Sequence, residues 1–296
     1  MTLVQLRNVT KEFTIRKGLQ RSTLTAVDDV SFDLLPGRTV ALVGESGSGK
    51  STIARMLMRL ETPTSGSINL ELGDGTPVLG SMYRRHVQMV FQDPFASLNP
   101  FHTIEHHIAR PLRIHGRTKS SRDTYERVLE MLERVNLVPA DNFAKRRPHE
   151  LSGGQRQRVA IARALAPGAQ VLVADEPVSM LDVSIRLGVL NLLARLQREE
   201  NLAVLYITHD LATARHFSDD IIVLLHGRIV ERGPADEVIL NPRHPYTQLL
   251  KASAPDPDGA GVLVGGTVER KDITNKRSFD HYTGEWSDES MQKSIQ

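Results

Sequence analysis

Residues 44–52 are Gly44-Glu45-Ser46-Gly47-Ser48-Gly49-Lys50-Ser51-Thr52, and they fit the pattern G-x-x-x-x-G-K-[ST] without a mismatch. The preceding run, residues 39–43, is short, apolar and β-branched, which is typical of a buried strand. The following run, residues 51–60, places apolar side chains on one face of a helix. A strand, a glycine-rich turn and a helix in this order form a phosphate-binding loop. The sequence therefore predicts a site for the phosphates of a nucleotide.

The residue types in this loop suit that chemistry. Gly44, Gly47 and Gly49 can adopt a positive φ, so that backbone N–H groups point inward at phosphate oxygens. The N-terminus of the following helix adds partial positive charge. Lys50 can reach the β- and γ-phosphates, and the hydroxyl of Ser51 can bind Mg²⁺. We expect the whole loop, residues 44–52, to contribute to nucleotide binding.

The composition is that of an ordinary soluble protein. The 296 residues include 40% hydrophobic and 24% charged residues, enough for one large or two modest domains with a sizeable core. A net charge of +2 gives no reason to expect nucleic acid as the main partner. The absence of cysteine excludes disulfides and cysteine-ligated metal centres. Since neither a signal peptide nor a bilayer-spanning apolar run is present, we expect a cytoplasmic location.

A second candidate anion site lies at the start of a predicted helix that ends at Leu165. Ser152 is suited to be its N-cap, and Pro167-Gly168 stops it. Gly153 and Gly154 occupy the first turn, where glycine is unfavourable relative to alanine. They leave backbone N–H groups accessible at the positive end of the helix. The start of this helix is therefore predicted to bind an anion.

Two further strands end in polar residues. The apolar run 171–175 ends in Asp175-Glu176, and the run 202–208 is followed by His209. The ends of parallel strands line the ligand crevice in sheets of this kind. Asp175 is suited to hold Mg²⁺ directly or through water, and Glu176 to act as the general base for the attacking water. His209 is expected to sense the γ-phosphate.

The rest of the chain predicts additional layers around this core. Strands over residues 2–9 and 26–35, separated by a polar loop from Arg16 to Thr25, indicate a small antiparallel β-layer. Residues 103–138 have a helical pattern and form an α-helical insertion. The segment 254–259 has the composition of a linker, a strand is possible at 262–268, and residues 271–296 are expected to be loosely ordered.

Five side chains leave two interpretations open. Phe13 is either a core aromatic or a ring that stacks on a purine. A histidine group could suggest a metal site, but no carboxylate or cysteine completes the set, and a solvated or partner-facing helix is the better interpretation. The group consists of His102, His106, His107 and His115.

Taken in order, these motifs resemble those of the ATP-binding cassette (ABC) ATPases. The resemblance covers residues 3–250 and rests on the phosphate loop, Gln92, the five residues 151–155, Asp175-Glu176, Asp182 and His209. It implies an α/β fold, in which a P-loop NTPase core of RecA type carries an antiparallel β subdomain and an α-helical subdomain inserted over about residues 95–165. The cofactors that it implies are ATP and Mg²⁺.

The same resemblance assigns roles that the residues alone leave open. Phe13 looks like the adenine-stacking aromatic, and Gln92 like the glutamine that joins Mg²⁺ and the attacking water. Asp182 looks like the residue that links two sites across a dimer. The signature residues are similar to those that bind the γ-phosphate of ATP held by an opposing subunit; they are Ser152, Gly153, Gly154 and Gln155. Hydrolysis with Glu176 as base, assisted by His209 and Lys50, would then open a head-to-tail dimer.

A narrower resemblance concerns three segments. Residues 91–100, residues 181–186 and the element Asn241-Pro242-Arg243-His244-Pro245-Tyr246-Thr247 are similar to the ATPases of oligopeptide and dipeptide importers. This implies a peripheral subunit on the cytoplasmic face of the inner membrane, with a second ATPase subunit, two permease subunits and an extracytoplasmic solute-binding protein. Importers of oligosaccharides or nickel in the same subfamily, and soluble non-transport ABC ATPases, are the alternatives.

Overall fold

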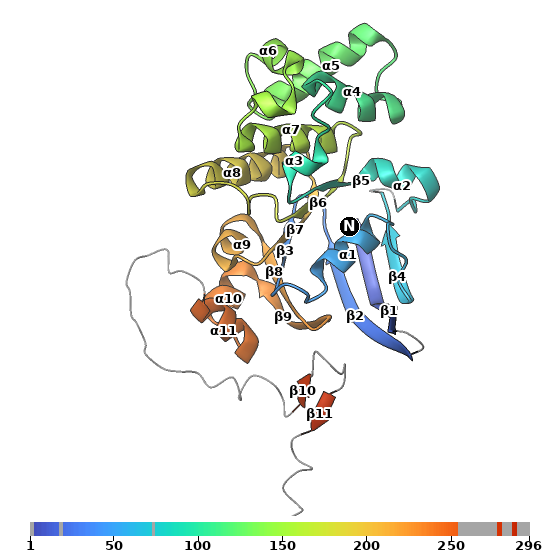
Figure 1. Ribbon diagram of the computed structural model, residues 1–296, viewed down its shortest axis with the longest axis vertical. Helices are drawn as coiled ribbons and strands as arrows, with labels where there is room; N and C mark the ends of the chain where they lie inside the picture. The colour runs from blue at the N-terminus through green and yellow to red at the C-terminus, as the bar shows by residue number, and fades with distance from the viewer. Residues whose placement is uncertain (1–2, 18–19, 73–74, 254–276, 280–285, 289–296) are drawn as a thin grey trace, which may run out of the picture.

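The main sheet runs through the middle of the molecule in Figure 1. This computed structural model describes residues 3–17, 20–72, 75–253, 277–279 and 286–288. The six strands of the sheet lie in the order β5 (Val87–Val90), β6 (Val171–Asp175), β7 (Ala203–Thr208), β3 (Thr39–Val43), β8 (Asp220–Leu225) and β9 (Arg228–Pro234). Neighbours are parallel from β5 to β8, and β9 pairs antiparallel with β8. The strand before the phosphate loop, β3, is therefore central.

The central strands are buried on both faces, as expected for parallel strands covered on two sides. All residues of β3 and β7 are buried. Alternate side chains of β3 belong to different hydrophobic clusters: Val40 and Leu42 pack on one face, and Ala41 and Val43 on the other. Because of this period of two, a continuous apolar run in the sequence serves two separate cores.

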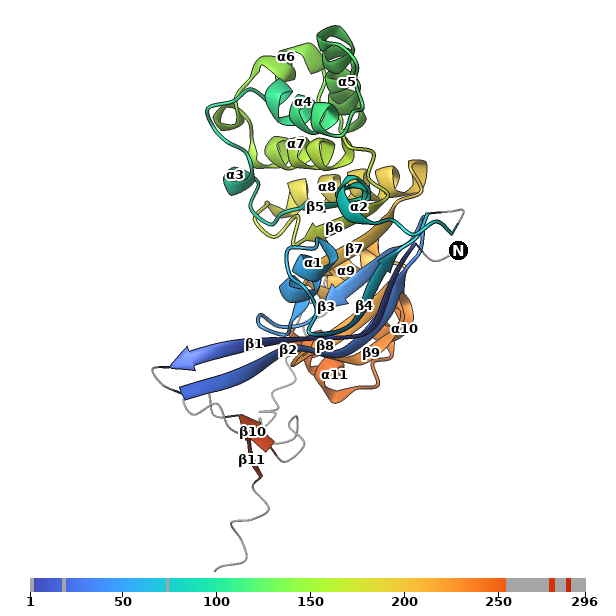
Figure 2. The same cartoon turned by 90° about the vertical axis from the view of Figure 1, so that its right-hand side faces the viewer.

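One face of the main sheet is covered by an antiparallel sheet in the order β2 (Gln20–Leu34), β1 (Val4–Lys17) and β4 (Ser65–Leu70). Figure 2 shows β1 and β2 as a long ribbon that extends beyond the main sheet. The prediction of a polar loop from Arg16 to Thr25 is wrong, because β1 and β2 pair as far as Lys17 with Gln20. This part of the ribbon has only two strands, so neither face has to be apolar, and polar residues can form strands there.

The helical part lies at the opposite end of the molecule from this ribbon in both views (Figures 1 and 2). It contains α3 (Pro94–Ser97), α4 (Ile104–Ile114), α5 (Ser121–Arg134), α6 (Ala140–Lys145), the 3₁₀ turn η1 (Pro148–Glu150) and α7 (Gly153–Leu165). The helical pattern predicted over residues 103–138 is divided between α4 and α5. Gly116, with φ +62°, follows α4, and the hydroxyl of Ser120 caps α5 by accepting the N–H of Asp123.

The remaining helices pack around the main sheet. They are α1 (Lys50–Leu57), α2 (Gly80–His86), α8 (Val183–Glu199), α9 (Leu211–Phe217), α10 (Ala235–Leu240) and α11 (Pro245–Ser253). The sequence interpretation missed α2, α8, α9 and α11. The N-terminus of α9 is capped by Asp210, whose carboxylate accepts the N–H groups of Ala212 and Thr213. That cap lies directly beside His209 and defines where strand β7 gives way to helix.

The C-terminal predictions fall mostly outside the described residues. Both the linker predicted at 254–259 and the strand predicted at 262–268 lie there. Within the described part of the tail, β10 (Arg277–Phe279) and β11 (Trp286–Asp288) pair antiparallel.

The glycine at position 66 provides a test of the β-layer. β1 has an irregular register between Arg7 and Thr10, and a Cβ on Gly66 would lie 2.2 Å from the carbonyl oxygen of Asn8. Gly75 has the same φ, +82° against +83°, with nothing within 4 Å of its Cβ position. We expect Gly75→Ala to cost only the roughly 1–2 kcal/mol of a positive φ, and Gly66→Ala clearly more, measured by urea unfolding. Equal losses would contradict the close approach at position 66.

Candidate functional site

The candidate site lies at one edge of the main sheet, where three parallel strands end. Val43, the last residue of β3, pairs with Thr208 of β7, and Asp175, the last residue of β6, pairs with Ile207. The phosphate loop, the Asp175-Glu176 pair and His209 therefore leave the sheet at the same edge. Such an edge is where ligands bind in open α/β sheets.

The loop is held closely against two neighbouring strands. A Cβ on Gly44 (φ +159°) would lie 2.3 Å from the carbonyl oxygen of Leu224, and one on Gly49 (φ +110°) 2.4 Å from that of Ala26. Only glycine fits at these two positions. Gly47 (φ +83°) has nothing within 4 Å of its Cβ position, so there glycine is favoured by backbone conformation alone.

Lys50 lies beneath the loop and is almost completely buried, with 6% of its surface exposed. Its Nζ donates to the carbonyl oxygens of Gly44 (2.6 Å) and Glu45 (2.7 Å). Burial lowers the pKa of Lys50 below its ordinary value, and the carboxylates of Glu176, Asp175 and Glu45 oppose that effect. The ammonium group is thus already placed at the loop, where phosphate oxygens could replace the carbonyls.

The carboxylate of Glu176 connects two other predicted site residues. Its Oε2 accepts a hydrogen bond from Nε2 of Gln92 (3.0 Å), and its Oε1 lies 3.0 Å from Nδ1 of His209. An ionised carboxylate only accepts hydrogen bonds, so Nδ1 of His209 carries the proton in this contact. The three side chains come from β5, β6 and β7 ends that are far apart in the sequence. The structure brings them together.

The backbone of Glu176 is equally constrained. It has a φ of +44°, which is unusual for a residue other than glycine. Its N–H donates to the carbonyl of Ile207 (2.9 Å), and its own carbonyl accepts the N–H and the hydroxyl of Ser179. Strain of this kind costs roughly 1–3 kcal/mol and clusters at functional sites. These bonds maintain the orientation that directs the side chain toward Gln92 and His209.

Asp175, which directly precedes Glu176, is partly buried. Burial, and then the charge of Glu176, raise the pKa of Asp175, while Lys50 and Arg55 act to lower it. A cation beside this carboxylate would relieve the repulsion between the two acids. The hydroxyl of Ser51, which is exposed, and the amide oxygen of Gln92 would complete an oxygen donor set of the kind that Mg²⁺ prefers. The residues present therefore fit that ion.

Phe13 lies on the ribbon that contacts the loop. It pairs with Leu24 on β2, two residues from Ala26, whose carbonyl oxygen lies beside Gly49. The ring is half-buried, and Nζ of Lys11 lies 4.9 Å from its centroid. Phe13 is therefore on the strand that pairs with the one beside the loop, and the purine-stacking interpretation stays a prediction.

The predicted second anion site lies on a different part of the molecule. Ser152 and Gln155 form a reciprocal cap: the Ser152 hydroxyl accepts the N–H of Gln155, and Oε1 of Gln155 accepts the N–H of Ser152. They begin α7, which belongs to the helical part, whereas the phosphate loop begins α1 near the β-layer (Figure 1). Within one chain, the structure does not bring these two predicted phosphate sites together.

The glycines of that helix have a packing role that the sequence interpretation missed. A Cβ on Gly154 would lie 2.4 Å from Cγ2 of Ile185 at the start of α8, and one on Gly153 3.3 Å from Leu181. Asp182 lies between those two contacts, is exposed, and precedes the first turn of α8 as its N-cap residue. The start of α7 and the segment around Asp182 therefore pack as one unit.

Comparison with known proteins agrees with this arrangement. Residues 27–179 match the sequence model of the ABC transporter family, and residues 230–275 match that of the oligopeptide/dipeptide transporter C-terminal region. The chain is 48% identical to the oligopeptide transport ATP-binding protein AppF of Bacillus subtilis, over 93% of this chain and 83% of the relative. For OppF of the same organism the identity is 46%, over 86% and 83%.

The chain belongs to the ABC transporter family. Among solved structures, the ATP-binding cassette MJ0796, determined as a dimer bound to ADP and phosphate, superposes with a TM-score of 0.66. The two chains are 33% identical, over 79% of this chain and 99% of that one. The fold is thus that of an ABC ATPase, as the motifs predicted, and the protein is a nucleotide-binding ATPase. Within the described residues, no helix has the length and apolar character needed to cross a bilayer.

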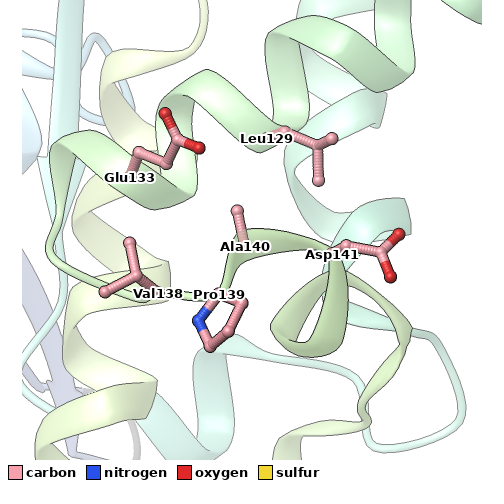
Figure 3. A pocket seen from close by; sticks show the side chains of 6 residues that line it. All are labelled: Leu129, Glu133, Val138, Pro139, Ala140 and Asp141. Carbon is pink, nitrogen blue, oxygen red and sulfur yellow. The ribbon is translucent and has the colours of Figure 1, made fainter.

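Two cavities of this ABC protein differ in character. One, about 890 Å³, lies beside the site and is lined by Gln92, Asp175, Phe91, Ile114 and the four histidines of the predicted group, among other residues. The other lies between α5 and α6 and is lined by Leu129, Glu133, Val138, Pro139, Ala140 and Asp141 (Figure 3). With two acidic and no basic side chains, the second cavity is unsuited to nucleotide phosphates.

Three of the four histidines in the group have rings that contact one another. The rings of His102 and His106 stack with centroids 4.0 Å apart, and His107 meets both edge-on. In the part of the chain that the structure describes, no three histidine, aspartate or glutamate side chains are grouped so that they could hold a metal ion. These rings lie in the wall of the larger cavity, and the partner-facing helix stays a prediction.

The contacts of Glu176 generate a prediction about catalysis. Glu176→Gln keeps the size of the side chain but removes the basic oxygen, so ATP turnover should fall by at least ~10²-fold, the low end for loss of a general base. ATP binding should persist, because Lys50 and the loop are unchanged. Glu133→Gln, at an exposed site on α5, is the matched control. Near-normal turnover of Glu176→Gln, measured as phosphate release, would remove Glu176 from this role.

Proposed function

We propose that this protein hydrolyses ATP to energise the uptake of oligopeptides or dipeptides through separate permease subunits. The observation that carries the peptide assignment is the match of residues 230–275 to the C-terminal region of oligopeptide/dipeptide transporters. The matches to AppF and OppF, each over 83% of the relative, support it, since both relatives are named as oligopeptide transport ATP-binding proteins. Oligosaccharide or nickel uptake is the alternative within the same kind of importer.

The proposed assembly contains two ATPase subunits arranged head to tail. Each ATP would lie between the phosphate loop of one subunit and residues 152–155 of the other, which explains why one chain holds these elements apart. Asp182, exposed beside the start of α7, would lie at the junction between subunits. We further propose two permease subunits, an extracytoplasmic solute-binding protein and a peripheral position on the cytoplasmic face of the membrane.

The chemical roles follow from the geometry of the site. Residues 44–52 would bind the phosphates, with Phe13 against the adenine. Ser51, Gln92 and Asp175 would hold Mg²⁺, which neutralises charge on the β- and γ-phosphates when bound. Glu176 would take a proton from the attacking water, oriented by hydrogen bonds from Gln92 and His209. His209, whose side chain is 61% exposed, is free to turn toward a γ-phosphate.

Gln92 is positioned to connect hydrolysis with transport. Its amide bonds Glu176, and the residue also lines the cavity between β5 and the helical part. Phe101 and Ile114 in the same region are 81% and 66% exposed, which suits a surface covered by another subunit. We propose that a permease segment occupies this cavity and that movement of the helical part reaches Glu176 through Gln92.

The domain organisation remains part of the proposal. We propose one nucleotide-binding domain over residues 3–250, with the helical insertion at about 95–165, followed by a C-terminal extension over residues 251–296. Helix α11 crosses the boundary between residues 250 and 251 and ends at Ser253.

Lys50→Ala tests the phosphate site directly. Loss of the ammonium group should abolish tight ATP binding, because the charge that pairs with the β- and γ-phosphates is gone. Binding of a fluorescent ATP analogue measures this, with Lys251→Ala, an exposed lysine on α11, as the control. Unchanged affinity in Lys50→Ala would exclude residues 44–52 as the nucleotide site.

The transported solute is tested with the complete importer. The ATPase should be reconstituted in liposomes with its permease subunits, and the solute-binding protein loaded in turn with a peptide, an oligosaccharide or nickel. Peptide alone should stimulate ATP turnover and enter the vesicles. Uptake of nickel or oligosaccharide instead would assign the protein to the alternative importers. ATP turnover that is the same with and without the permeases would favour a non-transport ATPase.

A further inference from the structure

The hydroxyl of Tyr246 contacts the phosphate loop from outside. Its Oη accepts a hydrogen bond from the backbone N–H of Glu45, with an N–O distance of 2.9 Å. Tyr246 lies in the first turn of α11, about two hundred residues later in the chain, and only 2% of its surface is exposed. A buried tyrosine hydroxyl normally has a hydrogen-bond partner. Here the partner is the loop itself.

The bond acts on a peptide unit that also contacts Lys50. The N–H of Glu45 and the C=O of Gly44 belong to one planar peptide group and point in opposite directions. The C=O of Gly44 accepts from Nζ of Lys50 at 2.6 Å. Tyr246 and Lys50 therefore hold the same peptide plane from its two sides. A rotation of that plane would break both contacts.

The position of Tyr246 is set by a second group of bonds. The carboxylate of Glu231, on β9, accepts the backbone N–H groups of Arg243 (2.8 Å) and His244 (3.1 Å). Burial alone would raise the pKa of Glu231, but hydrogen bonds to its carboxylate outweigh burial and lower it. The N–H of Tyr246 in turn donates to Nδ1 of His244 (3.2 Å). These bonds fasten the turn before α11 to the main sheet.

We propose that Tyr246 is a positioning residue for nucleotide binding, which fixes the Gly44–Glu45 peptide and thereby keeps Lys50 directed at the phosphates. The inference rests on the proposed phosphate site. It gives the His244-Pro245-Tyr246 element a role in the ATPase cycle. A Phe ring would fill the same buried space, so the proposed role belongs to the hydroxyl alone.

The test is Tyr246→Phe in the full chain, with ADP as the probe because it binds without being hydrolysed. Removal of the hydroxyl leaves the Glu45 N–H without its partner, and the peptide plane becomes free to rotate. We expect ADP affinity to fall roughly 5- to 150-fold, the effect of one unsatisfied buried donor. Calorimetry measures the affinity. In NMR spectra, the Glu45 amide should shift and exchange its hydrogen faster, while that of Ile53 in α1 stays unchanged.

Tyr206→Phe is the matched control, since Tyr206 is fully buried and its hydroxyl bonds Thr213 (3.1 Å), away from the loop. It should lower thermal stability to a similar extent and leave ADP affinity within about twofold. Glu231→Gln, which loosens the turn but keeps the tyrosine, should weaken ADP binding by a smaller factor. That variant also carries the test if Tyr246→Phe fails to fold.

The possible outcomes separate the inference from the site on which it rests. ADP affinity and Glu45 exchange like those of the unmodified protein in Tyr246→Phe would overturn the inference. A loss of ADP affinity in Tyr206→Phe equal to that in Tyr246→Phe would also overturn it, because the loss would then follow from lower stability of the protein in general. If Lys50→Ala binds ADP normally in the same assay, the phosphate site itself is wrong.

Discussion

The site depends on the close approach of the phosphate loop to two backbone carbonyls. Gly44 and Gly49 leave no space for a Cβ beside the carbonyl oxygens of Leu224 and Ala26. One of these carbonyls belongs to the main sheet and the other to the β-layer, so the loop is held between the two sheets. These carbonyl oxygens would repel a phosphate on their side of the loop. The N–H groups of the loop must therefore point to the opposite side to bind one. The fold therefore fixes which side of the loop can receive an anion.

The parallel sheet positions the proposed catalytic residues in the same way. Because β6 and β7 are in register, Glu176 and His209 leave the sheet side by side, and the bonds of Glu176 to Ile207 and Ser179 hold a backbone conformation that the residue would not adopt alone. Gln92 reaches the same carboxylate from β5. Strand pairing thus stabilises the positive φ of Glu176, and both oxygens of its carboxylate are oriented as a result.

Much of this was accessible from the sequence, for physical reasons. Continuous apolar runs ending in glycine or carboxylates identify buried parallel strands, so the core and the order of the site residues could be predicted. The extension of β1 beyond residue 9 and of β2 before residue 26 was missed, because an exposed two-sided ribbon needs no apolar alternation. The contact between Tyr246 and Glu45 has no local signal, since nothing in a sequence records which backbone N–H a distant hydroxyl will meet. The packing of Gly154 on Ile185 is hidden for the same reason.

In the isolated chain, several groups expected to bind phosphate already have internal partners. Lys50 donates to the carbonyls of its own loop, and Ser152 and Gln155 satisfy each other in the cap of α7. In the proposed dimer, ATP would exchange the cap bonds of α7 for bonds to its phosphates, so that half of the site would gain less than its donors alone suggest. In the proposed dimer, the additional free energy would become available when both halves close on one nucleotide, where charge-assisted bonds form in a site with little water. If the site is divided between two chains as proposed, tight nucleotide binding and association of the subunits are the same event.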